Sequence, residues 1–185
     1  MSRGEEPRPA SAEKPNFARH SLGTSRRKVV HDEKSVASRP RVLSQKRIAV
    51  VGVSRTGSGA ACAIFRKLRE TGHETYAVNG KGGEVDGVCL HFDLTSIPTP
   101  DGVVVVTPAP AALGVVEECA RLGIKRVWVH RGMDGGSTSP EAIDYCRMAG
   151  MSVIPGACPM MFCKPVDFWH RCMCWMLRLT GKLPR

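Results

Sequence analysis

From Arg47 onward, short uninterrupted apolar runs alternate with segments whose apolar residues recur at helical spacing. The first run, 48–53, is followed by a helical pattern that ends at Gly72, and the two patterns continue to alternate to residue 154. Strands that are apolar on both faces are typical of a parallel sheet covered by helices on both sides. We therefore predict an α/β protein with a Rossmann-like three-layer domain and a five-stranded, mainly parallel sheet. Its strands are expected at 48–53, 75–78, 102–107, 126–130 and 151–154.

Composition and charge divide the chain into three parts. Residues 1–44 are rich in Ser, Pro, Arg and Glu and are predicted to be a disordered basic arm. Residues 45–165 form the Rossmann-like domain, and 166–185 form an amphipathic helix and tail. The formal net charge of +10 lies in the ends, because 48–165 hold eleven basic and eleven acidic residues. A nucleic-acid partner is disfavoured, since the arm offers a single aromatic residue, Phe17, for base stacking, and we interpret the arm as a solvated tail.

The sequence argues against several other classes of protein. No run approaches the ~18 apolar residues of a membrane span. The first residues lack the apolar core of a secretory signal, so a cytoplasmic location with reduced thiols is expected. No metal is expected, because the cysteines and the histidine between 158 and 174 lack the paired spacing of zinc sites. The turn after the first strand is one residue too long for the Gly-x-Ser-x-Gly elbow of a hydrolase.

The residues that follow the strands indicate where a ligand binds. In open parallel sheets, ligands bind beyond the carboxyl ends of the strands, where the strand order reverses. The first such end is the turn Gly52-Val-Ser-Arg-Thr-Gly-Ser-Gly59, which leads from a strand into a helix. A turn of this kind presents backbone N–H groups and the positive end of a helix to a phosphate. Phosphate binding is therefore predicted at this turn.

Two departures from the dinucleotide-binding fingerprint bear on the identity of the phosphate compound. The fingerprint has glycine where this chain has Ser54, and an acid after the second strand where this chain has Asn79-Gly-Lys81. A lysine there suits an additional ribose phosphate, either the 3′-phosphate of coenzyme A or the 2′-phosphate of NADP. Plain NAD is disfavoured, and a solvated loop lysine is the alternative interpretation of Lys81.

Five short motifs, in this order, carry a resemblance to a known family. They are Gly52-x-Ser54, Gly80-Lys-Gly-Gly83, Pro108-Ala-Pro110, Gly123-Ile-Lys125 followed by Val127-Trp-Val129, and Gly156-Ala-Cys-Pro-Met-Met-Phe162. The segment 48–163 resembles the CoA-binding domain in the alpha subunit of succinyl-CoA synthetases. It resembles even more closely the small stand-alone bacterial CoA-binding proteins that consist of little else.

The resemblance implies a role for each loop. Ser54 to Ser58 would contact the phosphates of CoA and Lys81 its phosphorylated ribose, Thr107 to Pro110 would wall the adenosine, and His130 to Gly132 would face the pantetheine arm. Two departures limit what can be carried over. Arg131 stands where the synthetase has an acid before its glycine, and the synthetase's second domain, with its phosphorylated histidine, has no room in the residues after the match. The resemblance therefore supports CoA binding and does not extend to acyl-CoA ligase activity.

Two features at the end of the chain leave alternatives open. Cys158 follows the fifth strand, where the pantetheine arm would end. It is interpreted either as a small buried residue or as a thiol that forms a mixed disulfide with bound CoA. The last helix, 166–180, is apolar almost all round. It either packs on the domain's own sheet or forms the seam of a homodimer.

These observations predict a protein that binds coenzyme A or an acyl-CoA through glycine-rich loops and is not an enzyme by itself. Two alternatives are kept: an NADP(H)-binding redox sensor or oxidoreductase, and a regulatory or partner subunit of a split acyl-CoA ligase. The small-molecule nucleotide ligand is expected to contact residues at all five strand ends. The candidate residues are Gly52, Ser54, Arg55, Thr56, Gly57, Ser58, Gly59, Asn79, Lys81, Thr107, Pro108, Pro110, His130, Arg131, Gly132 and Cys158.

Overall fold

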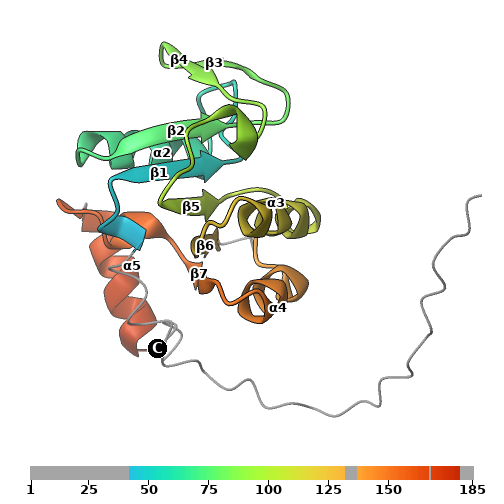
Figure 1. The fold of residues 1–185 in the computed structure, drawn as a ribbon. Coiled ribbons are helices and arrows are strands. Elements are labelled where there is room, and N and C mark those ends of the chain that lie inside the picture. The colour runs from blue at the N-terminus through green and yellow to red at the C-terminus, as the bar shows by residue number, and fades with distance from the viewer. Residues whose placement is uncertain (1–41, 132–136, 167, 180–185) are drawn as a thin grey trace, which may run out of the picture. The chain divides into compact units, whose positions relative to one another are not determined.

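The computed structural model describes residues 42–131, 137–166 and 168–179. They form an α/β domain around a five-stranded sheet, in which every strand runs parallel to its neighbours (Figure 1). The predicted fold class is confirmed. The predicted arm lies outside the described residues as far as residue 41, and the domain boundaries stay predictions. The strand order is β2 (Glu74–Val78), β1 (Arg47–Val51), β5 (Gly102–Val105), β6 (Arg126–His130) and β7 (Ser152–Ala157).

An α-helix lies in the connection from β1 to β2, from β5 to β6 and from β6 to β7, and the ends of these helices follow signals in the sequence. Ser139 caps the helix that follows it, because its Oγ accepts a hydrogen bond from the backbone N–H of Ala142 at 3.2 Å. Gly123 ends the preceding helix with φ +72°, which a glycine adopts without strain. Short 3-10 helices lie at η1 (Leu94–Ser96) and η2 (Pro159–Met161). The α-helices are α2 (Ala60–Glu70), α3 (Ala109–Arg121), α4 (Pro140–Met148) and α5 (Phe168–Leu179).

Alternation along the strands sends side chains into two cores, one on each face of the sheet. Ile48 and Val50 of β1 belong to the core that α2 covers, together with Trp128 of β6. Ala49 and Val51 belong to the core that α3 and α4 cover, and Figure 1 shows these two helices beside each other. The sheet is therefore buried on both faces, which explains why its strands are apolar without interruption.

The cysteines on the helices are packed inside these cores. Cys62 of α2, Cys119 of α3 and Cys146 of α4 are buried, as their apolar helix faces predict. Burial raises the pKa of Cys119 to about 12 and that of Cys146 to about 11, because a thiolate is poorly solvated there. The thiols of Cys119 and Cys146 therefore stay protonated at neutral pH.

A β-hairpin follows β2, where the sequence predicts only a glycine-rich loop. Its strands are β3 (Gly83–Val85) and β4 (Val88–Leu90), which pair antiparallel. The turn between them consists of Asp86 and Gly87, both with positive φ, at 51° and 72°. Two-residue turns of this kind match the twist of a hairpin, and Asp-Gly is a favoured sequence for them.

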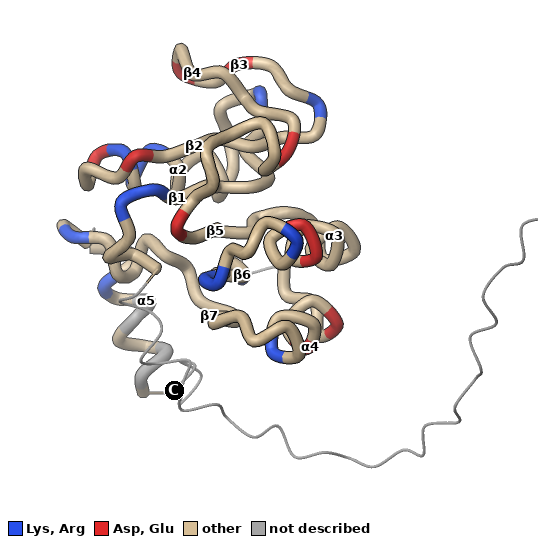
Figure 2. The backbone as a smooth tube through the Cα atoms, in the orientation of Figure 1, with Lys and Arg blue, Asp and Glu red and all other residues tan. Residues whose placement is uncertain are grey.

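Charged residues are spread over the described part of the domain, and Figure 2 shows basic and acidic segments interspersed along the backbone. One ion pair joins the starts of two central strands, because Arg47 Nη2 lies 2.9 Å from Asp101 Oδ1. The hydrogen bonds from Arg47 lower the pKa of the Asp101 carboxyl. The equal numbers of basic and acidic residues in 48–165 are therefore distributed along the domain without a segment of one sign.

Helix α5 exposes a large apolar face. Phe168, Trp175, Met176 and Leu179 are all exposed, so this face does not pack on the domain's own sheet. Packing on that sheet and a dimer seam were the two predicted alternatives, and for these four exposed side chains packing on the sheet is wrong. Among the described residues, no helix combines the length and the apolar character that crossing a membrane requires.

Candidate functional site

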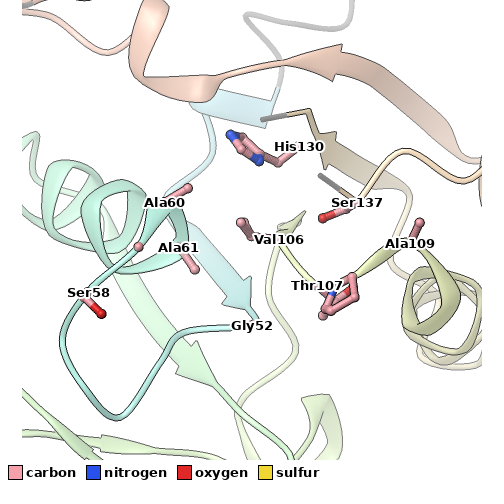
Figure 3. Close-up of a pocket in the computed structure, with 11 residues that line it drawn as sticks. Gly52, Ser58, Ala60, Ala61, Val106, Thr107, Ala109, His130 and Ser137 are labelled. Atoms are coloured by element: carbon pink, nitrogen blue, oxygen red, sulfur yellow. The ribbon is translucent and has the colours of Figure 1, made fainter. Parts of the chain in front are cut away.

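The order of the strands places a crevice between the carboxyl ends of β1 and β5. The chain leaves β1 for α2 on one face of the sheet and leaves β5 for α3 on the other face. Connections that diverge in this way open a crevice at the sheet edge. A pocket of about 460 Å³ lies there, within the usual size range of small-molecule sites. Its wall consists of Gly52, Ser58, Gly59, Ala60, Ala61, Val106, Thr107, Pro108, Ala109, His130 and Ser137 (Figure 3).

Two helices begin at this pocket. α2 starts directly after Gly59, and α3 starts directly after Pro108. Neither residue forms a side-chain hydrogen bond to its helix, and neither first turn holds an acidic residue. The first N–H groups of a helix lack partners within the helix and carry partial positive charge. The pocket therefore offers positive potential to an anion, although its wall contains no lysine or arginine.

Gly52 brings the end of β1 against the end of β5. Its φ is +103°, and its backbone N–H donates a hydrogen bond to the carbonyl of Val78 at 2.9 Å. A Cβ at this position would lie 2.5 Å from the carbonyl oxygen of Val106, which is far inside van der Waals contact. Both the backbone conformation and the close approach therefore require glycine.

Three hydroxyl groups follow one another along the turn between β1 and α2. Ser54 Oγ lies 2.8 Å from Thr56 Oγ1, which lies 2.7 Å from Ser58 Oγ. The backbone N–H of Thr56 also donates to Ser54 Oγ at 3.2 Å. Ser58 lines the pocket, whereas Ser54 and Thr56 lie on the turn that leads to it. The row adds hydrogen-bond donors beside the N-terminus of α2.

The loop after β2 is tied to this turn through Asn79. The Asn79 side-chain amide donates to the carbonyl of Val53 at 2.7 Å, and its oxygen accepts from the backbone N–H of Lys81 at 2.9 Å. The Arg55 side chain lies against Gly83, where a Cβ would be 2.7 Å from Arg55 Cδ. Lys81 itself is exposed and outside the pocket wall. The predicted contact with Lys81 therefore requires a ligand that extends beyond the pocket towards β2.

Arg66 of α2 joins the same turn to the β3–β4 hairpin, a role that sequence reasoning missed. Its Nη2 donates to the carbonyl of Gly57 at 2.9 Å and to Asp86 Oδ1 at 3.0 Å. Its Nε donates to Asp86 Oδ2 at 2.6 Å. These bonds hold the pKa of the Asp86 carboxyl below its usual value. The hairpin thus supports the turn through the side chain of Arg66.

The predicted site residues are only partly brought together. Ser54, Arg55, Thr56 and Gly57 lie on the turn beside the pocket wall. Pro110 and Arg131 are exposed and outside the wall, and Gly132 lies outside the described residues. The predicted residues that do line the pocket are Gly52, Ser58, Gly59, Thr107, Pro108 and His130.

Cys158 lies outside the pocket wall. It precedes η2, is buried in the core beneath α2, and places its Sγ 4.0 Å from Nε2 of His170 in α5. The predicted mixed disulfide with CoA stays a prediction. As far as the structure describes the chain, its histidine, cysteine and acidic residues form no group of three that could hold a metal ion.

Comparison with known proteins identifies the domain. The sequence model of the CoA-binding domain family matches residues 46–164. The chain belongs to this family. Its CoA-binding domain is 30% identical, over 126 residues, to the alpha subunit of an ADP-forming acetate–CoA ligase I from Pyrococcus furiosus; the match covers 61% of this chain and 27% of that subunit. An ADP-forming acetate–CoA ligase from Methanocaldococcus jannaschii is 28% identical over 81 residues, which are 43% of this chain and 12% of that protein.

The chain therefore spans only about a quarter, or less, of the curated relatives that it matches. Solved structures of smaller proteins match the CoA-binding domain over most of their length. A protein from Thermus thermophilus is 27% identical with a TM-score of 0.57, and the match covers 67% of this chain and 92% of that one. A hypothetical protein from Pyrococcus horikoshii is 24% identical with a TM-score of 0.63, and the match covers 74% of this chain and 94% of that protein. This likeness shows the shared fold.

Sequence reasoning missed four residues in the wall of this CoA-binding domain's pocket. Some signals were present, since small residues at the start of a helix after a glycine turn leave space for a ligand. Ser137 gave no such signal, because it follows the fourth strand at a distance that no motif fixes. The missed residues are Ala60, Ala61, Val106 and Ser137, whereas Ala109 lies within the predicted range Thr107 to Pro110.

Proposed function

We propose that this CoA-binding domain binds coenzyme A or an acyl-CoA in the pocket between β1 and β5. The observation that carries the proposal is the pair of helix N-termini, of α2 and α3, that meet there without a capping side chain. Their N–H groups suit the pyrophosphate, and the hydroxyls of the first turn add donors beside them. The family match supports CoA as the compound that carries this pyrophosphate. The proposed role is recognition, with no reaction assigned to the pocket.

Calorimetric titration of the full chain with CoA, NADPH and NADH tests this proposal. CoA should bind, and both nicotinamide dinucleotides should bind at least tenfold more weakly. Tighter binding of NADPH would instead favour the redox sensor or oxidoreductase. The proposal that the pocket catalyses no reaction is tested by incubating the protein with acetyl-CoA and detecting free thiols. Release of free CoA faster than in a sample without protein would contradict it.

Lys81 should select the additional phosphate on the ribose. Its exposed ammonium group stands after β2, beyond the pocket wall, where the 3′-phosphate of an extended ligand would arrive. Lys81→Ala should weaken CoA about tenfold and leave dephospho-CoA almost unchanged, since a partly solvated charge pair contributes about 1–1.5 kcal/mol. Titration of both ligands measures this difference. An equal loss for the two ligands would show that Lys81 does not contact the 3′-phosphate.

A second candidate function is that of a subunit in a split acyl-CoA ligase. The similarity to the alpha subunit of an acetate–CoA ligase favours it, and the match covers 27% of that subunit. Co-purification of this chain with a protein carrying the missing ligase domains, followed by an assay for acyl-CoA formation, tests this role. No complex and no activity would leave CoA binding as the function.

We also propose that the exposed face of α5 is the seam of a homodimer. Phe168, Trp175 and Leu179 recur at intervals of seven and four, which places them along one side of the helix. Light scattering should give twice the chain's mass of 20.1 kDa. Trp175→Glu should return a monomer, because burying a carboxylate in an apolar seam is costly. A monomeric mass for the unaltered chain would rule out the seam.

A further inference from the structure

Two hydroxyl groups in the pocket wall are buried without a hydrogen-bond partner. Thr107 Oγ1 and Ser137 Oγ are both inaccessible to solvent, and within the described part of the chain neither has a donor or acceptor in reach. Ser137 is fully buried as a residue. A buried polar group that lacks a partner destabilises the folded protein, so most such groups are paired. Two in the wall of one pocket indicate that a ligand supplies the missing partners.

Ser137 is held in place by its backbone. Its N–H donates to the carbonyl of His130 at 3.0 Å, so the residue lies directly beside the end of β6. Figure 3 shows the Ser137 hydroxyl directed into the space that His130 and Val106 border. Ser58 and the start of α2 lie on the other side of the same pocket in this view. The hydroxyl therefore faces a part of the ligand different from the part that the N-terminus of α2 attracts.

The surroundings of this hydroxyl define the kind of group that it can recognise. The pocket wall contains glycine, alanine, valine, proline, serine and threonine with one histidine, and no carboxylate, lysine or arginine. A hydroxyl among such residues suits a neutral group that can both donate and accept hydrogen bonds. An amide fits this description, because its N–H and its C=O can each pair with a hydroxyl.

We infer that the Ser137 hydroxyl hydrogen-bonds an amide of the pantetheine arm and thereby makes the site specific for intact CoA over its nucleotide half. This inference rests on the proposed function, since CoA carries its charge on the phosphates and its amides on the uncharged arm. The missing partner of Ser137 is then supplied only when the arm is present. Ser137 is thus a specificity-determining residue. Its unpaired hydroxyl destabilises the ligand-free protein, and this loss is recovered only when CoA binds.

Ser137→Ala separates this role from a structural one. The variant should bind CoA about tenfold more weakly, the loss expected for one hydrogen bond to an uncharged group. It should bind adenosine 3′,5′-diphosphate, which lacks the arm, as tightly as the unaltered chain. Its melting temperature without ligand should not fall, because the hydroxyl has no partner to lose in the empty site. Thr138→Val is the matched control. It removes a neighbouring buried hydroxyl that is also unpaired among the described residues but lies outside the pocket wall. This variant should bind CoA as tightly as the unaltered chain.

The titrations and the melting temperatures distinguish a failure of the inference about Ser137 from a failure of the proposed function. Unchanged CoA affinity in Ser137→Ala, or an equal loss for CoA and adenosine 3′,5′-diphosphate, would overturn the inference while leaving CoA binding intact. A lower melting temperature in the empty state would show that Ser137 acts in folding. Failure of the unaltered chain to bind CoA would instead overturn the proposed function itself.

Discussion

Gly52→Ala should lower the melting temperature by roughly 5–15 °C and abolish most CoA binding. Two costs add at this position: a backbone conformation at φ +103° that side chains rarely adopt, and a Cβ only 2.5 Å from the carbonyl oxygen of Val106. Val106 cannot easily move away, because its N–H donates to the carbonyl of Val51 at 2.9 Å. Together we expect a loss of about 2–5 kcal/mol in the free energy of unfolding. The backbone shift that relieves the clash would also move the edge where the pocket lies.

Two other glycines separate these costs. Gly59 has φ +91° but no atom within 4 Å of the position of a Cβ, so Gly59→Ala carries backbone strain without a clash. Gly114 lies within α3, exposed and with open space around it, so Gly114→Ala should stabilise the chain by about 0.5–1 kcal/mol. Thermal unfolding should give the lowest melting temperature for Gly52→Ala and the next lowest for Gly59→Ala. The unaltered chain should follow, and Gly114→Ala should have the highest melting temperature. If Gly52→Ala and Gly59→Ala have the same melting temperature, the close approach of β1 to β5 is not what requires glycine at position 52.

The sheet could be predicted from the sequence because burial on both faces leaves an unmistakable pattern. All five strands, including 48–53 and 126–130, appear as apolar runs between turn signals, and the helices between them are followed by Gly72, Gly123 and Gly150, all with positive φ. The β3–β4 hairpin was not predicted, although Asp86-Gly87 is a recognisable turn sequence. Its strands are only three residues long, and its glycine-rich start resembles a ligand-binding loop.

The candidate site was predicted less completely, because its chemistry comes from the backbone. Glycine turns and helix starts can be located along a sequence, and in this way Gly52, Gly59 and Pro108, which line the pocket, were predicted as site residues. Whether a polar side chain faces the ligand or its own loop depends on tertiary contacts. Asn79 illustrates this point: its amide bonds to Val53 and Lys81, so it supports the loop from within the protein. Side-chain identity alone cannot distinguish these two roles.

Ala60→Glu should weaken CoA binding on the order of 100-fold while leaving the empty protein at least as stable. Ala60 is the first residue of α2 and lines the pocket, and the first turn of this helix contains no acid. A carboxylate there interacts favourably with the helix N-terminus, which contributes about 0.3–1 kcal/mol to stability. The same carboxylate would stand where the pyrophosphate is proposed to bind and would repel it, at about 1–4 kcal/mol for each pair of charges 4 Å apart. Stability and affinity should therefore change in opposite directions.

Two variants show whether the charge and its place are responsible. Ala60→Gln has nearly the size of the glutamate without its charge, so it should cost much less affinity if repulsion dominates. Met148→Glu adds the same charge at the last residue of α4, which is exposed, outside the pocket wall and away from the starts of α2 and α3, and should change CoA affinity only slightly. Calorimetry and thermal unfolding of the three proteins give both quantities. Equal losses for Ala60→Gln and Ala60→Glu would mean that the pocket excludes bulk at this point, and that its anion lies elsewhere than at the start of α2.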